Sequence, residues 1–247
     1  MNIKFIIIIM GLLVSACQAE SNISELHTDF QQWLKNSEAV PSHFTLKDGG
    51  LYAKESLDSG GEIHFKETGY ACIAYAPHRF YDLHTLDIAR SLFNDCQVLL
   101  TNTKHRTSRD ANGVLIDFGK YKESAANAFI LAYADTVESF TIFQLHGFAK
   151  EKRKTNQGRK ADIIVSQGRE NASLFTRNIT DCLNEKLNVT VMLYGRDIYE
   201  LGGTKNILTT LAPSNSQFIH IELSREIREK LITDNHLLKL FKQCLTS

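Results

Sequence analysis

Histidines and acidic residues follow short apolar segments at separate places in this chain. His78 comes directly after one such segment, Asp82 lies four residues further on, and His146 ends a second segment. Ligands gather at the carboxyl ends of strands in an open α/β sheet, so we expect these side chains to meet. Two histidines and one carboxylate, with a fourth position left open, are common protein ligands of catalytic zinc. The pattern therefore predicts one zinc ion bound by His78, Asp82 and His146, with His84 as the alternative to Asp82.

Glu222 is an acidic residue inside an apolar segment, 217–223, that has the pattern of a buried strand. An unpaired carboxylate in a buried strand is unfavourable, so this residue needs either an ion-pair partner or a chemical role. Beside zinc, a carboxylate can take a proton from the attacking water and deliver it to a leaving amine. We therefore expect Glu222 to be the catalytic acid and base of an amide hydrolase. An ion pair with Arg225 or Arg228 is the alternative.

Further polar residues follow other apolar segments and could bind a substrate. Asn102 and Arg106 come after one segment, Arg169 follows another, and Asp117 lies between them in the chain. The guanidinium group of arginine is planar and suits a carboxylate. We expect Asn102, Arg106 and Arg169 to bind a small or peptidic substrate with a free carboxylate. The glycine-rich segment 202–206 lacks a phosphate-binding pattern and is expected to form the rim of the pocket.

The segments that must position these residues alternate between strand and helix patterns. Residues 21–37 have apolar residues at helical spacing, and residues 44–67 combine short apolar runs with glycine pairs typical of antiparallel strands. Further along, the expected strands are 70–76, 96–101, 139–145, 162–166, 189–194 and 217–223, and the expected helices are 84–94, 121–136, 172–186 and 224–245, the last broken near Asp234. This alternation predicts a three-layer α/β/α domain with a mostly parallel mixed central sheet.

The order of the motifs resembles that of a known superfamily. APHRFYD, NTKHR, LHGF, DIIVSQGRENAS, ELGGTKNI and FIHIELSREIRE follow one another along most of the chain. This set is similar to the zinc-dependent amidohydrolase and carboxypeptidase-like superfamily, in particular to N-formylglutamate amidohydrolases and poly-γ-glutamate hydrolases. The resemblance implies a phosphorylase/hydrolase-like fold with one zinc ion. It also implies that His78, Asp82 and His146 are the metal ligands, that Glu222 is catalytic, and that Arg106 binds the substrate carboxylate.

The N-terminus has the features of a bacterial export signal. A short positive region precedes an apolar stretch over residues 5–14, which is too short to span a bilayer comfortably. Residues 14–17, Val-Ser-Ala-Cys, resemble a lipobox, whose cysteine becomes the lipid-bearing first residue. We expect Cys17 to anchor a periplasmic protein in the cell envelope, at the outer membrane that Gln18 favours. Cleavage after Ala19, which would give a secreted soluble protein, and an uncleaved anchor are the alternatives.

The chain has five cysteines, an odd number for an exported protein. If Cys17 carries the lipid, the remaining four form an even set in an oxidising compartment. We expect the disulfides Cys72–Cys96 and Cys182–Cys244, because each pair would join neighbouring elements. Four buried free thiols are the alternative. The spacings lack the close pairs of a zinc–thiolate site.

Composition limits the domain organisation and the partners. The chain has 247 residues, of which 43% are hydrophobic and 23% charged, which suits one globular domain. We expect a signal peptide over 1–17, an N-terminal helix or tether over 18–40, and one catalytic domain over 41–247. The 28 basic residues balance 28 acidic ones, so nothing indicates nucleic-acid binding. The basic segment 150–160 is expected to be a solvated loop, and the protein to be a monomer.

Three other functions remain compatible with parts of the pattern. An inactive lipoprotein of the same fold would act as a binding module and tolerate the loss of Glu222. A serine esterase would use Ser166, although this residue lacks the G-x-S-x-G motif that surrounds such nucleophiles. A metal storage or sensing protein would have no need of Glu222.

Overall fold

The computed structural model describes residues 17–246, and the side chains of the first helix from residue 23 onward. Residues 1–16 of the expected signal peptide over 1–17, and the side chain of Cys17, lie outside the described residues, so lipidation stays a prediction. No helix in the described part of the chain is both long enough and apolar enough to cross a membrane.

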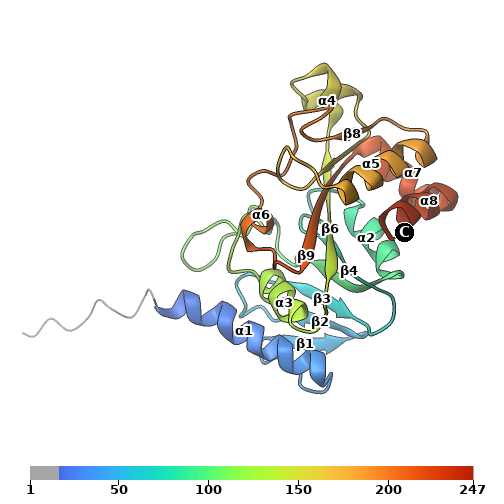
Figure 1. Cartoon of the computed structure of the whole chain (residues 1–247). Coiled ribbons are helices and arrows are strands. Elements are labelled where there is room, and N and C mark those ends of the chain that lie inside the picture. The colour runs from blue at the N-terminus through green and yellow to red at the C-terminus, as the bar shows by residue number, and fades with distance from the viewer. Residues whose placement is uncertain (1–16, 247) are drawn as a thin grey trace, which may run out of the picture.

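A nine-stranded sheet forms the centre of the protein, in the order β1-β2-β3-β5-β4-β6-β9-β7-β8 (Figure 1). The strands are β1 (Phe44–Lys47), β2 (Gly50–Ala53), β3 (Glu62–Phe65), β4 (Tyr70–Ala76), β5 (Cys96–Thr101), β6 (Phe140–Phe148), β7 (Ile163–Ser166), β8 (Val191–Leu193) and β9 (Ser216–Ser224). In the middle, β5, β4, β6 and β9 run parallel, so their carboxyl ends meet at one edge. The strands β1, β2 and β3 pair antiparallel on one side, and β7 pairs antiparallel to β9 on the other.

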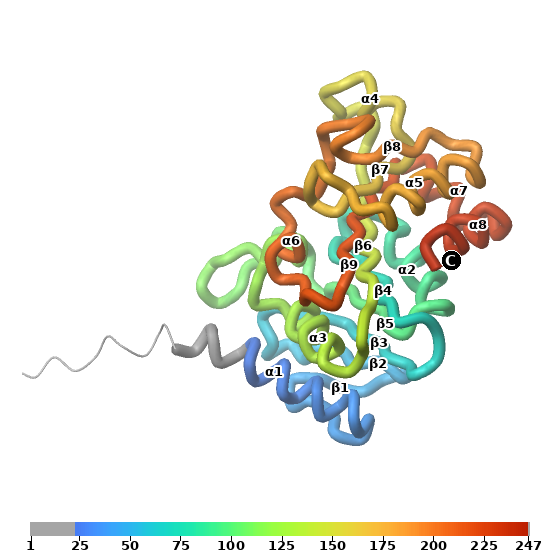
Figure 2. Tube along the Cα trace, in the orientation of Figure 1, coloured from blue at the N-terminus to red at the C-terminus, as the bar shows by residue number. Residues whose placement is uncertain are grey.

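Helices cover both faces of this sheet (Figures 1 and 2). The helical segments are α1 (Cys17–Lys35), α2 (Thr85–Phe93), α3 (Ala125–Ala134), η1 (Lys150–Lys152), α4 (Asn156–Lys160), α5 (Leu174–Leu187), α6 (Leu208–Leu211), α7 (Arg225–Thr233) and α8 (Asn235–Thr246). Helices α1 and α3 pack together on one face, whereas α2, α5, α7 and α8 lie on the other. The three-layer mixed α/β fold expected from the sequence is therefore confirmed.

The alternation of side chains along β4 explains why the core has two halves. Ile73 and Tyr75 belong to the apolar cluster that contains Phe30 of α1 and Phe129 of α3. Ala74 and its neighbours on the opposite face belong to the cluster beneath α2, α5 and α8. Successive side chains of a strand point to opposite faces, so a strand that is apolar throughout must be covered on both sides. Helix α1 is thus part of the core.

The expected elements are confirmed with shifts of a few residues, including the break between α7 and α8 at Asp234. Two expectations were wrong. The basic segment 150–160, expected to be a loop, contains η1 and α4. We also expected Arg169, which follows the segment 162–166, to lie with the other strand ends, but β7 runs antiparallel to β9, with Ser166 opposite His220. Its carboxyl end therefore points towards the other edge of the sheet. A short apolar run indicates burial but contains no information about strand direction.

Both expected disulfides are present. Cys72–Cys96 joins β4 to β5, and Cys182–Cys244 joins α5 to α8. Each disulfide therefore links neighbouring elements on the same side of the sheet. Because all four cysteines are paired, the alternative of four free thiols is excluded.

Candidate metal centre

A tight turn after β4 brings His78 and Asp82 together. Pro77 follows the last residue of β4, and the carbonyl oxygen of His78 then accepts hydrogen bonds from the backbone N–H groups of Tyr81 and Asp82, both at 2.8 Å. Residues four apart in such a helical turn lie on the same side. The Asp82 carbonyl oxygen in turn accepts a hydrogen bond from the Thr85 hydroxyl at the start of α2. The turn is thereby fixed at both of its ends.

The side chains of His78, Asp82 and His146 converge at the carboxyl edge of the parallel strands. Oδ2 of Asp82 lies 3.4 Å from Nδ1 of His78 and 3.5 Å from Nδ1 of His146. One potential ligand atom from each of the three residues lies within 4.8 Å of the other two. All three side chains are buried. The structure thus brings together the three residues expected to bind the metal.

The opposite ring nitrogen of each histidine is occupied by an oxygen that can only accept a hydrogen bond. Nε2 of His78 lies 2.7 Å from Oδ1 of Asp117, and Nε2 of His146 lies 3.0 Å from Oε1 of Gln144. Each Nε2 therefore carries a hydrogen, so in the neutral form of each ring the lone pair of Nδ1 faces Asp82. Metal-binding histidines usually donate their second N–H group to such a carboxylate or carbonyl oxygen, which fixes the tautomer and the ring orientation.

Nδ1 of His78 is a buried atom that forms no hydrogen bond within the described part of the chain. Leaving a buried polar atom unsatisfied costs about 1–3 kcal/mol. A divalent cation placed between the two Nδ1 atoms and Asp82 would satisfy it. The tautomers, the orphaned nitrogen and the donor set therefore fit a metal such as zinc.

The charges around the three residues favour an ionised carboxylate and one neutral imidazole. Burial alone would raise the pKa of Asp82, but the neighbouring His146 and His78 outweigh it and hold this pKa well below its usual range. Burial and the neighbouring His220 lower the pKa of His146 to about 4, so its ring is neutral at pH 7. Burial also works to lower the pKa of His78, yet Asp117 and Asp82 together raise it.

Glu222 lies beside the three residues because of the register between β6 and β9. His146 and Glu222 are direct partners in this ladder, and Gln144 pairs with His220 two residues earlier. Oε1 of Glu222 lies 3.2 Å from Nε2 of His220. We had not expected roles for Gln144 and His220. The signal for both was available, since polar residues two apart in a buried strand share one face.

Of the three residues expected to bind the substrate, only one lies at the centre formed by His78, Asp82 and His146. Arg106 reaches the centre and forms an ion pair with Asp117 at 2.9 Å. The Asn102 side chain is buried and donates to the Lys104 carbonyl oxygen, and Arg169 lines a cavity at the opposite edge of the sheet, where β9 begins. The structure therefore joins Arg106 to the three potential ligands but does not place Asn102 or Arg169 with them.

Two alternatives from the sequence are also placed away from the centre. His84 occupies the N-cap position of α2, with its Nδ1 3.5 Å from Asp87, and does not join the cluster of potential ligands. The Ser166 hydroxyl is buried, donates to the Gly202 carbonyl oxygen and accepts from the Gly168 N–H group. A hydroxyl engaged in this way holds the glycine-rich loop and is unsuited to act as a nucleophile.

Two cavities adjoin the centre and share Arg106, His146, Leu201 and Glu222 in their walls. We call the first the glycine-loop cavity; its volume is about 370 Å³ and its rim includes residues 202–206. The second, of about 410 Å³, we call the arginine cavity, because it is lined by Arg106, Arg153, Arg225 and Arg228. The expectation that the glycine-rich segment forms a pocket rim is confirmed.

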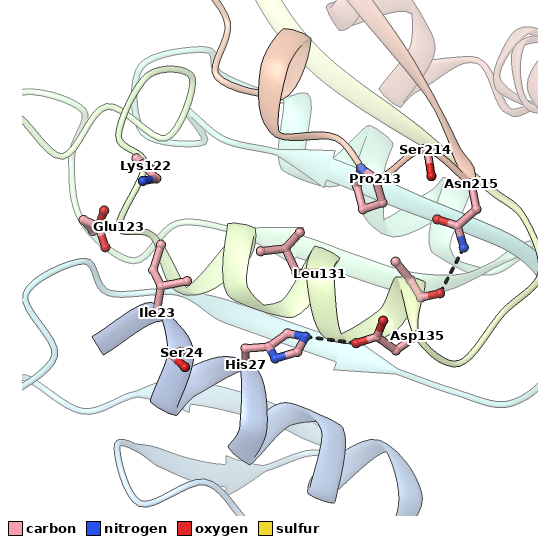
Figure 3. Close-up of a pocket in the computed structure, with 11 residues that line it drawn as sticks. Ile23, Ser24, His27, Lys122, Glu123, Leu131, Asp135, Pro213, Ser214 and Asn215 are labelled. Carbon is pink, nitrogen blue, oxygen red and sulfur yellow. Dashed lines mark hydrogen bonds and ion pairs between the residues drawn. The ribbon is translucent and has the colours of Figure 1, made fainter. Parts of the chain in front are cut away.

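A larger cavity, of about 740 Å³, lies elsewhere, between α1, α3 and the segment before β9 (Figure 3). His27 of α1 and Asp135 approach to 3.0 Å there, and Asn215 donates to the Ala134 carbonyl oxygen. The His27–Asp135 pair is partly exposed to solvent, and it belongs to no potential metal cluster among the described residues. Size alone therefore does not identify the functional site in this molecule.

Comparison with known proteins supports the fold. No family model and no curated protein matches the chain. YndL in a zinc-free form is similar in structure, with 19% identity, a TM-score of 0.50, and coverage of 78% of this chain and 89% of YndL. The N-formylglutamate amidohydrolase from Ralstonia eutropha JMP134 is also similar, with 14% identity, a TM-score of 0.52, and coverage of 75% of this chain and 97% of that one. This protein has their fold. The resemblance read from the motif order is thus supported in three dimensions, at the level of fold.

Proposed function

We propose that this protein is a zinc-dependent hydrolase that cleaves an amide bond in a substrate with a free carboxylate. The observation that carries the proposal is the convergence of two histidine Nδ1 atoms on the carboxylate of Asp82, with both Nε2 atoms already occupied. The fold shared with N-formylglutamate amidohydrolase supports the same reaction class. When bound, zinc would supply a Lewis acid that polarises the amide carbonyl and activates water.

Glu222 is suited to move the proton in this reaction. Its side chain lines both cavities beside the three ligands, and only 8% of the residue is exposed. In the proposed reaction, a Glu222 carboxylate oxygen accepts a proton from the attacking water and then delivers it to the amide nitrogen that leaves. The adjacent His220 holds the carboxylate from one side, which limits its orientation.

Arg106 is suited to hold the substrate carboxylate. It lies at the boundary of the two cavities, and its guanidinium group is fixed between Asp117, at 2.9 Å, and the ring of Tyr81, at 5.1 Å from the centroid. A fixed planar donor loses less conformational entropy when it binds a carboxylate. Asp117 contacts both Arg106 and His78, so it joins the substrate-binding residue to a metal ligand.

The first test is the metal content of the purified protein. We expect about one zinc ion per chain, with loss of the metal in His146→Ala and Asp82→Asn. His84→Ala is the matched control, because His84 lies outside the ligand cluster and should leave the content unchanged. Glu222→Gln should retain the metal but lose hydrolysis of N-acyl-glutamates and γ-glutamyl peptides by about a hundredfold or more. A protein that takes up no zinc would refute the proposal and favour a binding module.

We also propose that the protein acts in the bacterial cell envelope, as a monomer anchored by lipid on Cys17. The lipobox-like residues 14–17 support the anchor, and the two disulfides support an oxidising compartment. Mass spectrometry of the N-terminal peptide from membranes should find a diacylglyceryl group on Cys17. The variant Cys17→Ser should be released from the membrane fraction. An unmodified Cys17 would favour cleavage after Ala19.

A further inference from the structure

The arginine cavity has a marked excess of positive charge. Its lining includes five cationic side chains: Arg106, Lys152, Arg153, Arg225 and Arg228. The acidic residues in its lining are Asp82 and Glu222, which are the proposed metal ligand and the proposed catalytic base. Among the described residues, the ion-pair contacts of these two carboxylates are to His78, His146 and His220, and neither lies within 4.0 Å of a cation of the outer wall.

Arg228 is the most unusual of these cations, because it is almost completely buried and lacks a counter-ion. Only 6% of the residue is exposed. Its Nε donates to the Ser224 carbonyl oxygen and its Nη1 to the Leu83 carbonyl oxygen. Within residues 17–246, no acceptor contacts Nη2 and no carboxylate lies within 4.0 Å of the guanidinium group. An isolated buried charge is unfavourable unless a partner compensates it.

Two neighbouring cations on the wall also have no ion-pair partner, and a third has only a long one. Arg225 and Lys152 are exposed, and in the described part of the chain neither forms an ion pair. Arg153 has a long contact of 3.8 Å with Glu200, and its guanidinium group lies over the ring of Phe148. The cavity therefore presents several guanidinium and ammonium groups that an anionic ligand could neutralise.

Gly147 provides the space that the Arg228 guanidinium group occupies. A Cβ atom at position 147 would lie 2.6 Å from Cζ of Arg228, which is closer than side chains pack. The absence of a side chain after His146 therefore allows Arg228 to lie against the backbone beside the proposed metal ligands.

We propose that the arginine cavity is a second anion subsite, which binds a carboxylate of the substrate other than the one held by Arg106. This inference rests on the proposed function, because it places a carboxylate-bearing substrate at the centre. Arg228 would donate from Nη2 to the ligand, and Arg225 and Lys152 would attract and hold it at the mouth of the cavity. The cleaved amide would then lie between two carboxylate groups.

The test measures binding of glutarate, a simple dicarboxylate, to the full-length protein after metal removal by a chelator. Calorimetric titration should show saturable binding that weakens as salt increases. Arg228→Gln should weaken it about tenfold or more, and Arg225→Gln and Lys152→Gln severalfold each. The matched controls are Lys120→Gln and Lys205→Gln, since both lysines line the glycine-loop cavity instead. Because no metal or turnover is needed, this result is independent of whether the protein proves to be a hydrolase.

A second variant displaces Arg228 without changing any charge. Gly147→Ala should push the guanidinium group from its place and weaken glutarate binding to a similar degree as Arg228→Gln. If thermal unfolding shows that either variant is not folded, the double variant of the exposed Arg225 and Lys152 to Gln decides the question. Glutarate binding that these variants leave unchanged, or that depends on Arg106 alone, overturns the proposal. Preference for inorganic phosphate over glutarate overturns the assignment to a carboxylate.

Discussion

Asp117 should control metal affinity although it is not itself a ligand. Its Oδ1 accepts hydrogen bonds from His78 Nε2 at 2.7 Å and from the Gly119 N–H group at 3.0 Å, while Oδ2 pairs with Arg106 at 2.9 Å. Loss of such a histidine partner typically lowers metal affinity 10–100-fold, or about 1.4–2.8 kcal/mol. Asp117→Ala removes the acceptor and should approach about a hundredfold. Asp117→Asn keeps one acceptor for the His78 N–H group, but this acceptor is neutral, and hydrogen bonds to a charged acceptor are roughly twice as strong as those to a neutral one. We therefore expect Asp117→Asn to lower zinc affinity by about tenfold.

The assay is competition for zinc between the protein and a chromophoric chelator at one fixed pH, with thermal unfolding of the metal-free proteins measured in parallel. Asp135→Asn is the matched control, because Asp135 also faces a histidine, His27 at 3.0 Å, but in the cavity between α1 and α3 (Figure 3). It should leave zinc affinity unchanged. If Asp117→Ala binds zinc as tightly as the original protein, then orientation of His78 by Asp117 does not matter and the reasoning is refuted.

Two further predictions concern stability. Burial would raise the pKa of Glu62, but the hydrogen bond from His64 and the charge of Arg79 outweigh it and lower this pKa from 4.5 to about 2. The unfolded state therefore binds more protons between these values, and stability on the order of 3 kcal/mol, present above about pH 4.5, should be lost as pH falls to about 2. Urea unfolding of Glu62→Gln should show a shallower acid dependence, and an equal dependence would contradict the assignment. Removing the Cys182–Cys244 disulfide, whose cysteines are 62 residues apart, should destabilise the protein by about 4 kcal/mol in denaturant unfolding, and an unchanged unfolding midpoint would contradict this.

Much of the site could be predicted because its residues stand at the ends of apolar segments. His78, His146 and Glu222 were each recognisable as polar residues at or within a buried strand, and the structure brings all three to one edge of the sheet. The i, i+4 spacing of Asp82 from His78 was also informative, because one helical turn places both side chains on the same side. Patterns of this kind depend only on residues that are close together in the chain, so the sequence is enough to detect them.

Contacts between distant segments could not be predicted in the same way. Asp117 lies 39 residues from His78 in the chain, and nothing in its own surroundings indicates that it faces an imidazole. From the sequence, Arg228 was considered only as an ion-pair partner of Glu222. In the structure, its guanidinium group occupies the space that a side chain at position 147 would fill. Such pairings depend on how helices and loops pack over the sheet edge.

The sequence by itself predicted the strands and the longer helices and the main metal-binding candidates, and it favoured the two disulfide pairs over free thiols. The short helical segments η1, α4 and α6 were not expected. Burial and turn formation depend on short stretches of chain, so periodicity and spacing are enough to reveal them. Only the tertiary structure decided that β7 runs antiparallel, which moves Arg169 to the other edge of the sheet, and that Gln144 and Asp117 orient the histidines. Strand direction and side-chain partners are set by packing between segments far apart in the chain, and no local pattern records that packing.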